Sequence, residues 1–211
     1  TKFTYVDFAD DAKVRVGEIY TRADFPKLVL EAKKEFASRY GLQAEYWRHF
    51  DVNEAPEVLS YLKSNLRDLA NHFHALYQAP ELAADKPAHF AEAERWYRDY
   101  LLSFPKDSDT PPINYQLADL LLEHQAFGEA ALQYERTAYA YTFHDKSAEA
   151  GYAALVSYER EAKALDGAAL AAWDRQRLES QQRFAVTFPA HPESATLLTR
   201  TAREYYDLKE L

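Results

Sequence analysis

The sequence predicts an all-α protein built from antiparallel helical hairpins, and three observations support this prediction. The 211 residues include only 5 Gly and 9 Pro, whereas Ala, Leu, Glu and Arg, which favour helices, are abundant. The sequence has no alternating runs rich in Val and Ile, the pattern typical of strands. Apolar residues instead recur at helical spacing, with Ala or Gly where a larger side chain would be expected. We therefore expect helices that pack closely.

The clearest hairpin is predicted over residues 112–143. Thr110 followed by two prolines favours a helix start, because proline fits the first turn, where its missing N–H would be unpaired anyway. Two apolar faces follow, separated by a predicted turn at 124–128; their members are Leu117, Ala118, Leu121 and Leu122, then Phe127, Ala130, Ala131, Tyr134 and Ala138. Short helices joined by a tight turn pack closely only if small residues lie at the crossing. We assign that role to Ala118 and Ala130.

This pattern of large, small and aromatic residues recurs along the chain. A copy over residues 10–40 has Val16, Ile19, Phe25, Leu28 and Ala32 at the matching positions. Further hairpins are predicted over 57–105 and 147–189, where Gly151 takes a small position and Phe188-Pro189 repeats Phe104-Pro105. A partial repeat at 192–211 supplies one more first helix. We expect a single repeat domain over residues 1–211.

A helix-turn-helix unit with these residues at these places resembles the tetratricopeptide repeat family. The match covers most of the chain from about residue 10, although the frequent first-position Trp is missing and Gly stands where expected only at Gly151. The resemblance implies a right-handed superhelical solenoid of antiparallel hairpins. The segment containing Phe104, Pro105, Tyr115, Leu117 and Ala118 is similar to bacterial envelope members of the BamD and YbgF type. That likeness implies a periplasmic or outer-membrane-associated scaffold; a cytoplasmic location is the alternative.

The concave side of such a solenoid offers a long groove lined by side chains of the first helices. By the family register, the candidate groove residues are Arg67, Asn71, His74, Tyr115, Asp119, Tyr152, Arg203 and Tyr206. Tyr and Arg are favoured in binding surfaces because they combine area with hydrogen bonding. We therefore expect a protein or peptide partner, and the alternative is a solvated helix face. Only Asn71 resembles the carboxylate clamp of chaperone-binding relatives, so recognition of a terminal carboxylate is not expected.

Composition excludes several other classes of function. The net charge of -9 argues against a nucleic-acid partner, because phosphate binding needs a concentrated basic face. No run of 18 apolar residues is present, so we expect no membrane span. The chain starts at Thr1 and contains no Met, which suggests a processed or trimmed N-terminus, and the partial last repeat suggests that the natural chain continues.

No pattern in the sequence points to catalysis, a cofactor or a metal. His72 and His74 are two residues apart on a predicted helix, so their imidazoles point in different directions and cannot share a metal. Nucleophile elbows and phosphate-binding glycine loops are absent. We therefore predict a non-catalytic interaction scaffold. Two alternatives stay open: a regulatory or structural subunit of an enzyme assembly, and a carbohydrate- or peptidoglycan-associated binding module.

Overall fold

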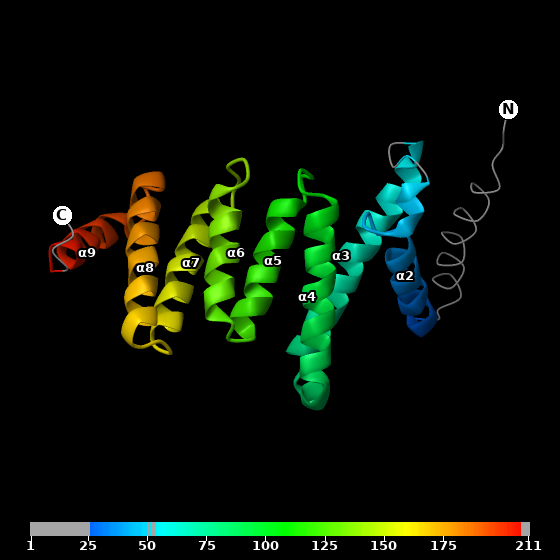
Figure 1. The fold of residues 1–211 in the computed structure, drawn as a ribbon, viewed down its shortest axis with the longest axis horizontal. Helices are drawn as coiled ribbons and strands as arrows, with labels where there is room; N and C mark the ends of the chain where they lie inside the picture. The colour runs from blue at the N-terminus through cyan, green and yellow to red at the C-terminus, as the bar shows by residue number, and fades with distance from the viewer. Residues whose placement is uncertain (1–25, 50, 52–53, 208–211) are drawn as a thin grey trace. The chain divides into compact units, whose positions relative to one another are not determined.

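A computed structural model describes residues 26–49, 51 and 54–207, and this part of the chain is helical, with no strand (Figure 1). The elements are α2 (Pro26–Tyr40), η1 (Glu45–Arg48), α3 (Pro56–Gln78), η3 (Pro80–Asp85), α4 (Lys86–Ser103), α5 (Thr110–Glu123), α6 (Phe127–Tyr139), α7 (Ser147–Ala162), α8 (Gly167–Thr187) and α9 (Ser194–Asp207). The all-α prediction is confirmed. The first helix predicted for residues 10–40, with Val16, Ile19 and Phe25, lies outside the described residues.

Local sequence signals account for several helix ends. Proline stands in the first turn of α3 and of α4, where no N–H is needed. Helix α2 ends at Tyr40, directly before Gly41, whose N–H donates to the Ala37 carbonyl at 2.9 Å. The turn predicted between α5 and α6 is present, and Gln125 adopts a positive φ of 64° there. Pro and Gly positions therefore predict these boundaries well.

The chain divides into two compact units, Thr1–Thr110 and Pro111–Leu211. In the first unit, α3 packs against α2 and α4; in the second, α7 packs against α6 and α8, and α8 against α9. Consecutive helices from α2 to α4, and from α5 to α8, run antiparallel within their units (Figure 1). The pair α3 and α4 lies within the predicted hairpin 57–105, and α5 to α9 lie within the predicted ranges 112–143, 147–189 and 192–211 to within two residues.

The core of the first unit is largely aromatic. Trp96, Tyr97 and Tyr100 of α4 are almost fully buried, in keeping with the 15% aromatic content. In α2 the prediction is wrong at Leu28, which is 45% exposed. The helix instead buries a face containing Phe36, whose ring lies edge-on to that of Tyr61 at 4.7 Å between centroids. The large ring of Phe36 buries more apolar area than Leu28 would.

The small residues predicted at the crossing of α5 and α6 are buried. Ala118, Ala130 and Ala131 have no exposed surface. Asn114 reaches across from α5 to α6, where its side-chain N–H₂ donates to the Gln133 carbonyl at 2.7 Å and to the Thr137 hydroxyl at 2.8 Å. The small side chains leave room for this close approach, and the amide holds the two helices together.

Three loops, each leading into a first helix, share one hydrogen-bond pattern. Asp107, His144 and His191 each accept, through a side-chain atom, the N–H two residues further on, at 2.8, 3.2 and 3.3 Å. A buried hydroxyl residue follows three residues after each of them: Thr110, Ser147 and Ser194. The hydroxyls of Thr110 and Ser194 donate to the carbonyls of Phe104 and Phe188, which are the first residues of the two Phe-Pro pairs. These loops define a common register for the helices on either side.

Candidate functional site

The candidate residues of the first unit lie on α3. Arg67 is exposed, and its guanidinium lies 3.5 Å from the Asp109 carboxylate. The Tyr97 hydroxyl donates to Asn71 Oδ1 at 3.1 Å and lies 3.0 Å from His74 Nδ1. Asn71 and His74 therefore tie α3 to α4. His74 is only 9% exposed, so it offers little surface to a partner, whereas His72 is exposed, as their spacing predicts.

A charge cluster lies beside Arg67 in the loop that precedes α5. Lys63 Nζ is 2.7 Å from the Asp107 carboxylate and 3.2 Å from that of Asp109. Burial alone would raise the pKa of Asp107, but the hydrogen bonds from Lys63, the Asp109 N–H and Tyr100, together with the charge of Lys63, outweigh burial, so the pKa lies below its ordinary range. Burial and this carboxylate raise the pKa of Tyr100, whose hydroxyl donates to Asp107 at 3.3 Å. The opposite charges of the cluster therefore balance one another, and their bonds fix the loop to α3 and α4.

The candidate residues of the second unit begin with Tyr115 of α5. Its hydroxyl donates to Glu149 of α7 at 2.9 Å, and the Lys146 ammonium lies 2.6 Å from the same carboxylate and 5.7 Å from the centre of the Tyr115 ring. Hydrogen bonds from Lys146 and then from Tyr115 lower the pKa of Glu149. The side chains of Tyr115 and Glu149 are 34 residues apart in the chain. They join two successive first helices.

Asp119 lies one helical turn further along α5 and faces α6. Its carboxylate accepts a hydrogen bond from the Tyr134 hydroxyl. Burial, followed by this hydrogen bond, raises the pKa of Tyr134. The rings of Tyr115 and Tyr134 meet edge to face, with centroids 5.4 Å apart. Asp119 is therefore partly engaged in holding α6 rather than presented to solvent alone.

The remaining candidates are more exposed. Tyr152 of α7 is 38% exposed, and its ring lies 5.2 Å from that of His191 and 6.0 Å from that of Phe184. On α9, Arg203 is exposed and Tyr206 is 68% exposed. A bond of 2.8 Å between Arg200 and Glu159 joins α9 to α7. Within the second unit, α7 thus contacts both neighbouring first helices through side chains of this face.

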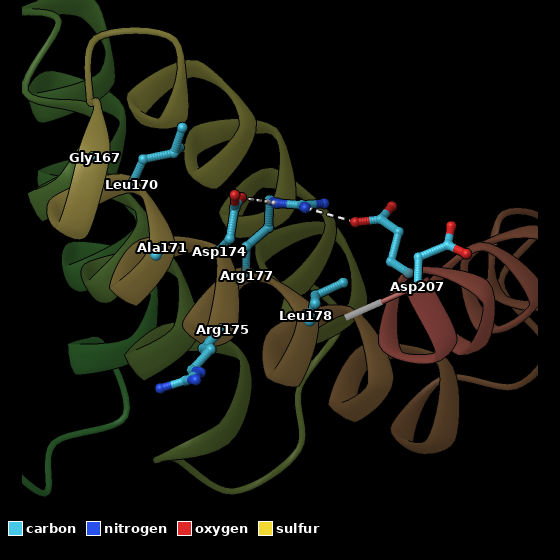
Figure 2. A pocket seen from close by; sticks show the side chains of 9 residues that line it. Gly167, Leu170, Ala171, Asp174, Arg175, Arg177, Leu178 and Asp207 are labelled. Atoms are coloured by element: carbon cyan, nitrogen blue, oxygen red, sulfur yellow. Dashed lines mark hydrogen bonds and ion pairs between the residues drawn. The ribbon is translucent and has the colours of Figure 1, made fainter. Parts of the chain in front are cut away.

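A pocket of about 410 Å³ between α8 and α9 was not predicted from the sequence. It is lined by Gly167, Leu170, Ala171, Asp174, Arg175, Arg177, Leu178, Glu204 and Asp207. Arg177 donates to Asp174 at 2.9 Å and to Glu204 at 2.6 Å (Figure 2). Burial lowers the pKa of Arg177, but its two carboxylate partners raise the pKa by more than burial lowers it, so the guanidinium stays charged. The sequence signal that could have found the pocket is Arg177, which stands where the predicted repeat has a small residue.

Two general observations bear on the class of site. Within residues 26–49, 51 and 54–207, no three His, Asp or Glu side chains are grouped as metal ligands. The same stretches contain no helix that is both long and apolar enough to cross a bilayer. No protein-family model matches the sequence, and no curated protein matches it significantly.

Proposed function

We propose that this chain is a non-catalytic protein-interaction scaffold of tetratricopeptide-like repeats, which stack into a right-handed superhelix and bind a protein or peptide on the face of their first helices. The observation that carries the proposal is the row formed by α5, α7 and α9. Tyr115 is bonded to Glu149, and Glu159 to Arg200, so successive first helices contribute to one face. Each hairpin is too small to bury its apolar side alone, and stacking in this order exposes the first helices together.

The chemistry of this face suits a polypeptide partner. Tyr152 and Tyr206 expose aromatic rings, and Arg203 adds a cation with several donors. Such residues contribute most to protein interfaces, because they combine large buried area with directional bonding. Asn71 and Tyr115 are bonded to neighbouring helices, so variants at these two positions would perturb folding together with binding. Tests of binding are therefore better placed at Tyr152 and Tyr206.

Site-specific photo-crosslinking tests the proposal. A benzophenone amino acid replaces Tyr152 or Tyr206 in one set of proteins, and Leu132 in the control. Leu132 is 50% exposed but lies on α6, a second helix. We expect the first two positions to crosslink one common partner in the source cells, while position 132 does not. The partner should also be lost from pull-downs with Tyr152→Ser and retained with Leu132→Ser.

Either of two results would count against a first-helix binding face. One is an identical set of adducts from positions 132, 152 and 206. The other is full retention of the partner by Tyr152→Ser together with Tyr206→Ser. Recovery of a single soluble enzyme in equal amounts would replace the scaffold by a subunit of that enzyme's assembly.

We also propose the bacterial cell envelope as the compartment, on the likeness of the segment around Phe104-Pro105 to envelope members of the family. Fractionation of the source cells tests this directly. Recovery in the periplasmic or outer-membrane fraction supports the proposal. Recovery with a cytosolic marker protein contradicts it without affecting the binding face.

A further inference from the structure

The three loops that share a hydrogen-bond pattern allow the second helices to be compared position by position. Fourteen residues before Asp107 and before His144 stand Ala93 and Ala130, which have no exposed surface. The same position before His191 is Arg177. A small residue that lets helices approach is thus replaced in α8 by a guanidinium. Arg177 lines the pocket, which lies between α8 and α9.

In the preceding pair of helices, α6 and α7, the equivalent place is filled by an indole. Trp173 of α8 packs its ring on Tyr158 of α7, with centroids 4.8 Å apart, and its Nε1–H donates to the Tyr158 carbonyl at 3.0 Å. The ring edge of Trp173 also comes within 3.4 Å of where a Cβ on Gly128 would lie. The next helix of the array therefore covers α6 and α7 by inserting one tryptophan.

One of the two residues that contact this indole corresponds to a residue that lines the pocket, and the other corresponds to the chain neighbour of a lining residue. In the loop register, Gly128 of α6 corresponds to Arg175 of α8, and Tyr158 of α7 corresponds to Tyr205 of α9. Arg175 lines the pocket. The position next to Tyr205 is Glu204, which also lines it. The pocket is thus the counterpart on α8 and α9 of the site that Trp173 fills on α6 and α7.

The lining combines an apolar floor with acidic groups. Leu170, Ala171 and Leu178 supply the floor, and Figure 2 shows Asp174 and Arg177 joined beside it. Three carboxylates line the pocket against two guanidinium groups, and one of these, Arg177, is held by Asp174 and by α9. A ring that enters with basic residues at its flanks would match both the floor and the net acidic charge.

We propose that this pocket binds the tryptophan side chain of an amphipathic helix that belongs to a partner protein and carries basic residues beside the ring. The helix lies across α8 and α9 as α8 lies across α6 and α7. The inference rests on the pocket and on the loop register. It does not depend on the first-helix face, because Tyr152, Arg203 and Tyr206 do not line the pocket.

The helix α8 itself supplies the first probe, because it performs the equivalent role within the chain. A fluorescein-labelled peptide with the sequence of residues 167–187 carries Trp173 and more basic than acidic residues. Its binding to the 211-residue chain is followed by fluorescence anisotropy. A second peptide with Trp173→Ala is the ligand control. N-acetyltryptophanamide, as an unlabelled competitor, tests the ring without the helix.

Two protein variants form a matched pair on α8. Ala171 and Ala172 are both exposed, but only Ala171 lines the pocket. Ala171→Trp places an indole of the protein itself in the pocket and should block the peptide. Ala172→Trp adds the same side chain to α8 outside the pocket. We expect saturable binding of the peptide, weakened about tenfold by Ala171→Trp and by the alanine peptide, and changed less than about twofold by Ala172→Trp.

Three results would overturn the proposal. The first is no saturable binding up to about 1 mM peptide, a concentration at which even a weak complex forms. The second is equal affinity for the peptides with and without tryptophan. The third is that N-acetyltryptophanamide binds as tightly as the peptide, which would make the pocket a small-molecule site rather than a helix-docking site. Circular dichroism of both protein variants confirms that they are folded before any of these results is interpreted.

Discussion

The most direct test of the packing is Gly151→Ala. Gly151 lies within α7 against a cluster of rings. A Cβ at this position would lie 2.9 Å from Phe184 Cδ2, 3.0 Å from Phe188 Cε2 and 3.1 Å from the Tyr139 hydroxyl. Carbon atoms in contact normally stand about 3.5 to 4 Å apart. The new methyl group would therefore overlap three side chains at once.

The rings have little freedom to move away. Phe184 has no exposed surface and Phe188 is 6% exposed, and their centroids are 5.3 Å apart. Tyr139 is also in contact with Arg183, whose guanidinium lies over the Tyr139 ring at 3.9 Å from its centre. Overpacking of this kind costs about 1–3 kcal/mol. The better helix propensity of Ala offsets about 1 kcal/mol of that loss, so the free energy of unfolding should fall by about 0–2 kcal/mol.

Gly128→Ala is the matched control. A Cβ there would meet Glu161 and Trp173 at 3.4 Å, which is ordinary contact, so this variant should be as stable as the parent or up to about 1 kcal/mol more stable. Urea titration followed by circular dichroism measures both variants. The gain in helix propensity is common to both variants and cancels between them, so Gly151→Ala should be less stable than Gly128→Ala by the overpacking cost of about 1–3 kcal/mol. Equal midpoints, or a Gly151→Ala protein more stable than the parent, would refute the account of the ring cluster.

Three further predictions concern buried or bonded positions. Ala118→Leu should overpack the crossing of α5 and α6 and lower the free energy of unfolding by about 1–3 kcal/mol; an unchanged urea midpoint would mean that the crossing lies elsewhere. Asn114→Ala removes the two hydrogen bonds that join α5 to α6, while the Thr137 hydroxyl still donates to the Gln133 carbonyl, so at about 0.5–1.5 kcal/mol for each bond we expect a loss of about 1–3 kcal/mol in the same titration, and no loss would show that the amide is dispensable. The lowered pKa of Asp107 stabilises the fold above about pH 4, its unfolded value, and this contribution disappears as the pH falls through the folded value. Asp107→Asn should therefore be less stable than the parent at pH 7 and approach it in acid; a difference that is the same at pH 7 and in acid would exclude the bond to Lys63 as its source.

Much of the helical structure could be predicted, because it rests on local signals. The prolines in the first turns of α3 and α5, Gly41 after α2 and the apolar spacing in 112–143 act over a few residues and are visible in a single sequence. The small residues Ala118 and Ala130 could be found for the same reason: they recur at the spacing of one helix face. The arrangement of α2 could not, because the burial of Phe36 rather than Leu28 depends on a contact with α3.

The candidate site was less predictable, because it depends on which side chain finds a partner. The family register places Asn71 and Tyr115 toward a groove, but helical spacing does not show that Tyr97 and Glu149 bond to them. Whether a polar residue faces a ligand or a neighbouring helix is decided by the side chains of other helices. The partial burial of Tyr152 likewise depends on its contact with His191, which lies in the loop after α8.

In α8 the predicted pattern of large and small residues is interrupted, so residue type alone does not reveal the correspondence with α4 and α6. Ten residues before its loop stands Gln181, where α4 and α6 have Tyr97 and Tyr134, and four residues earlier Arg177 replaces an alanine. Gln181 thus replaces the large residue of the predicted pattern, and Arg177 replaces the small one. The loop after α8 nevertheless keeps the side-chain cap and the buried hydroxyl of the other two loops. The polar replacements are satisfied within the pair of helices: Gln181 is bonded to Thr201, and Arg177 to carboxylates on both helices. Polar bonds thus join α8 to α9 at the positions where α6 has Ala130 and Tyr134, and the pocket lies beside these bonds.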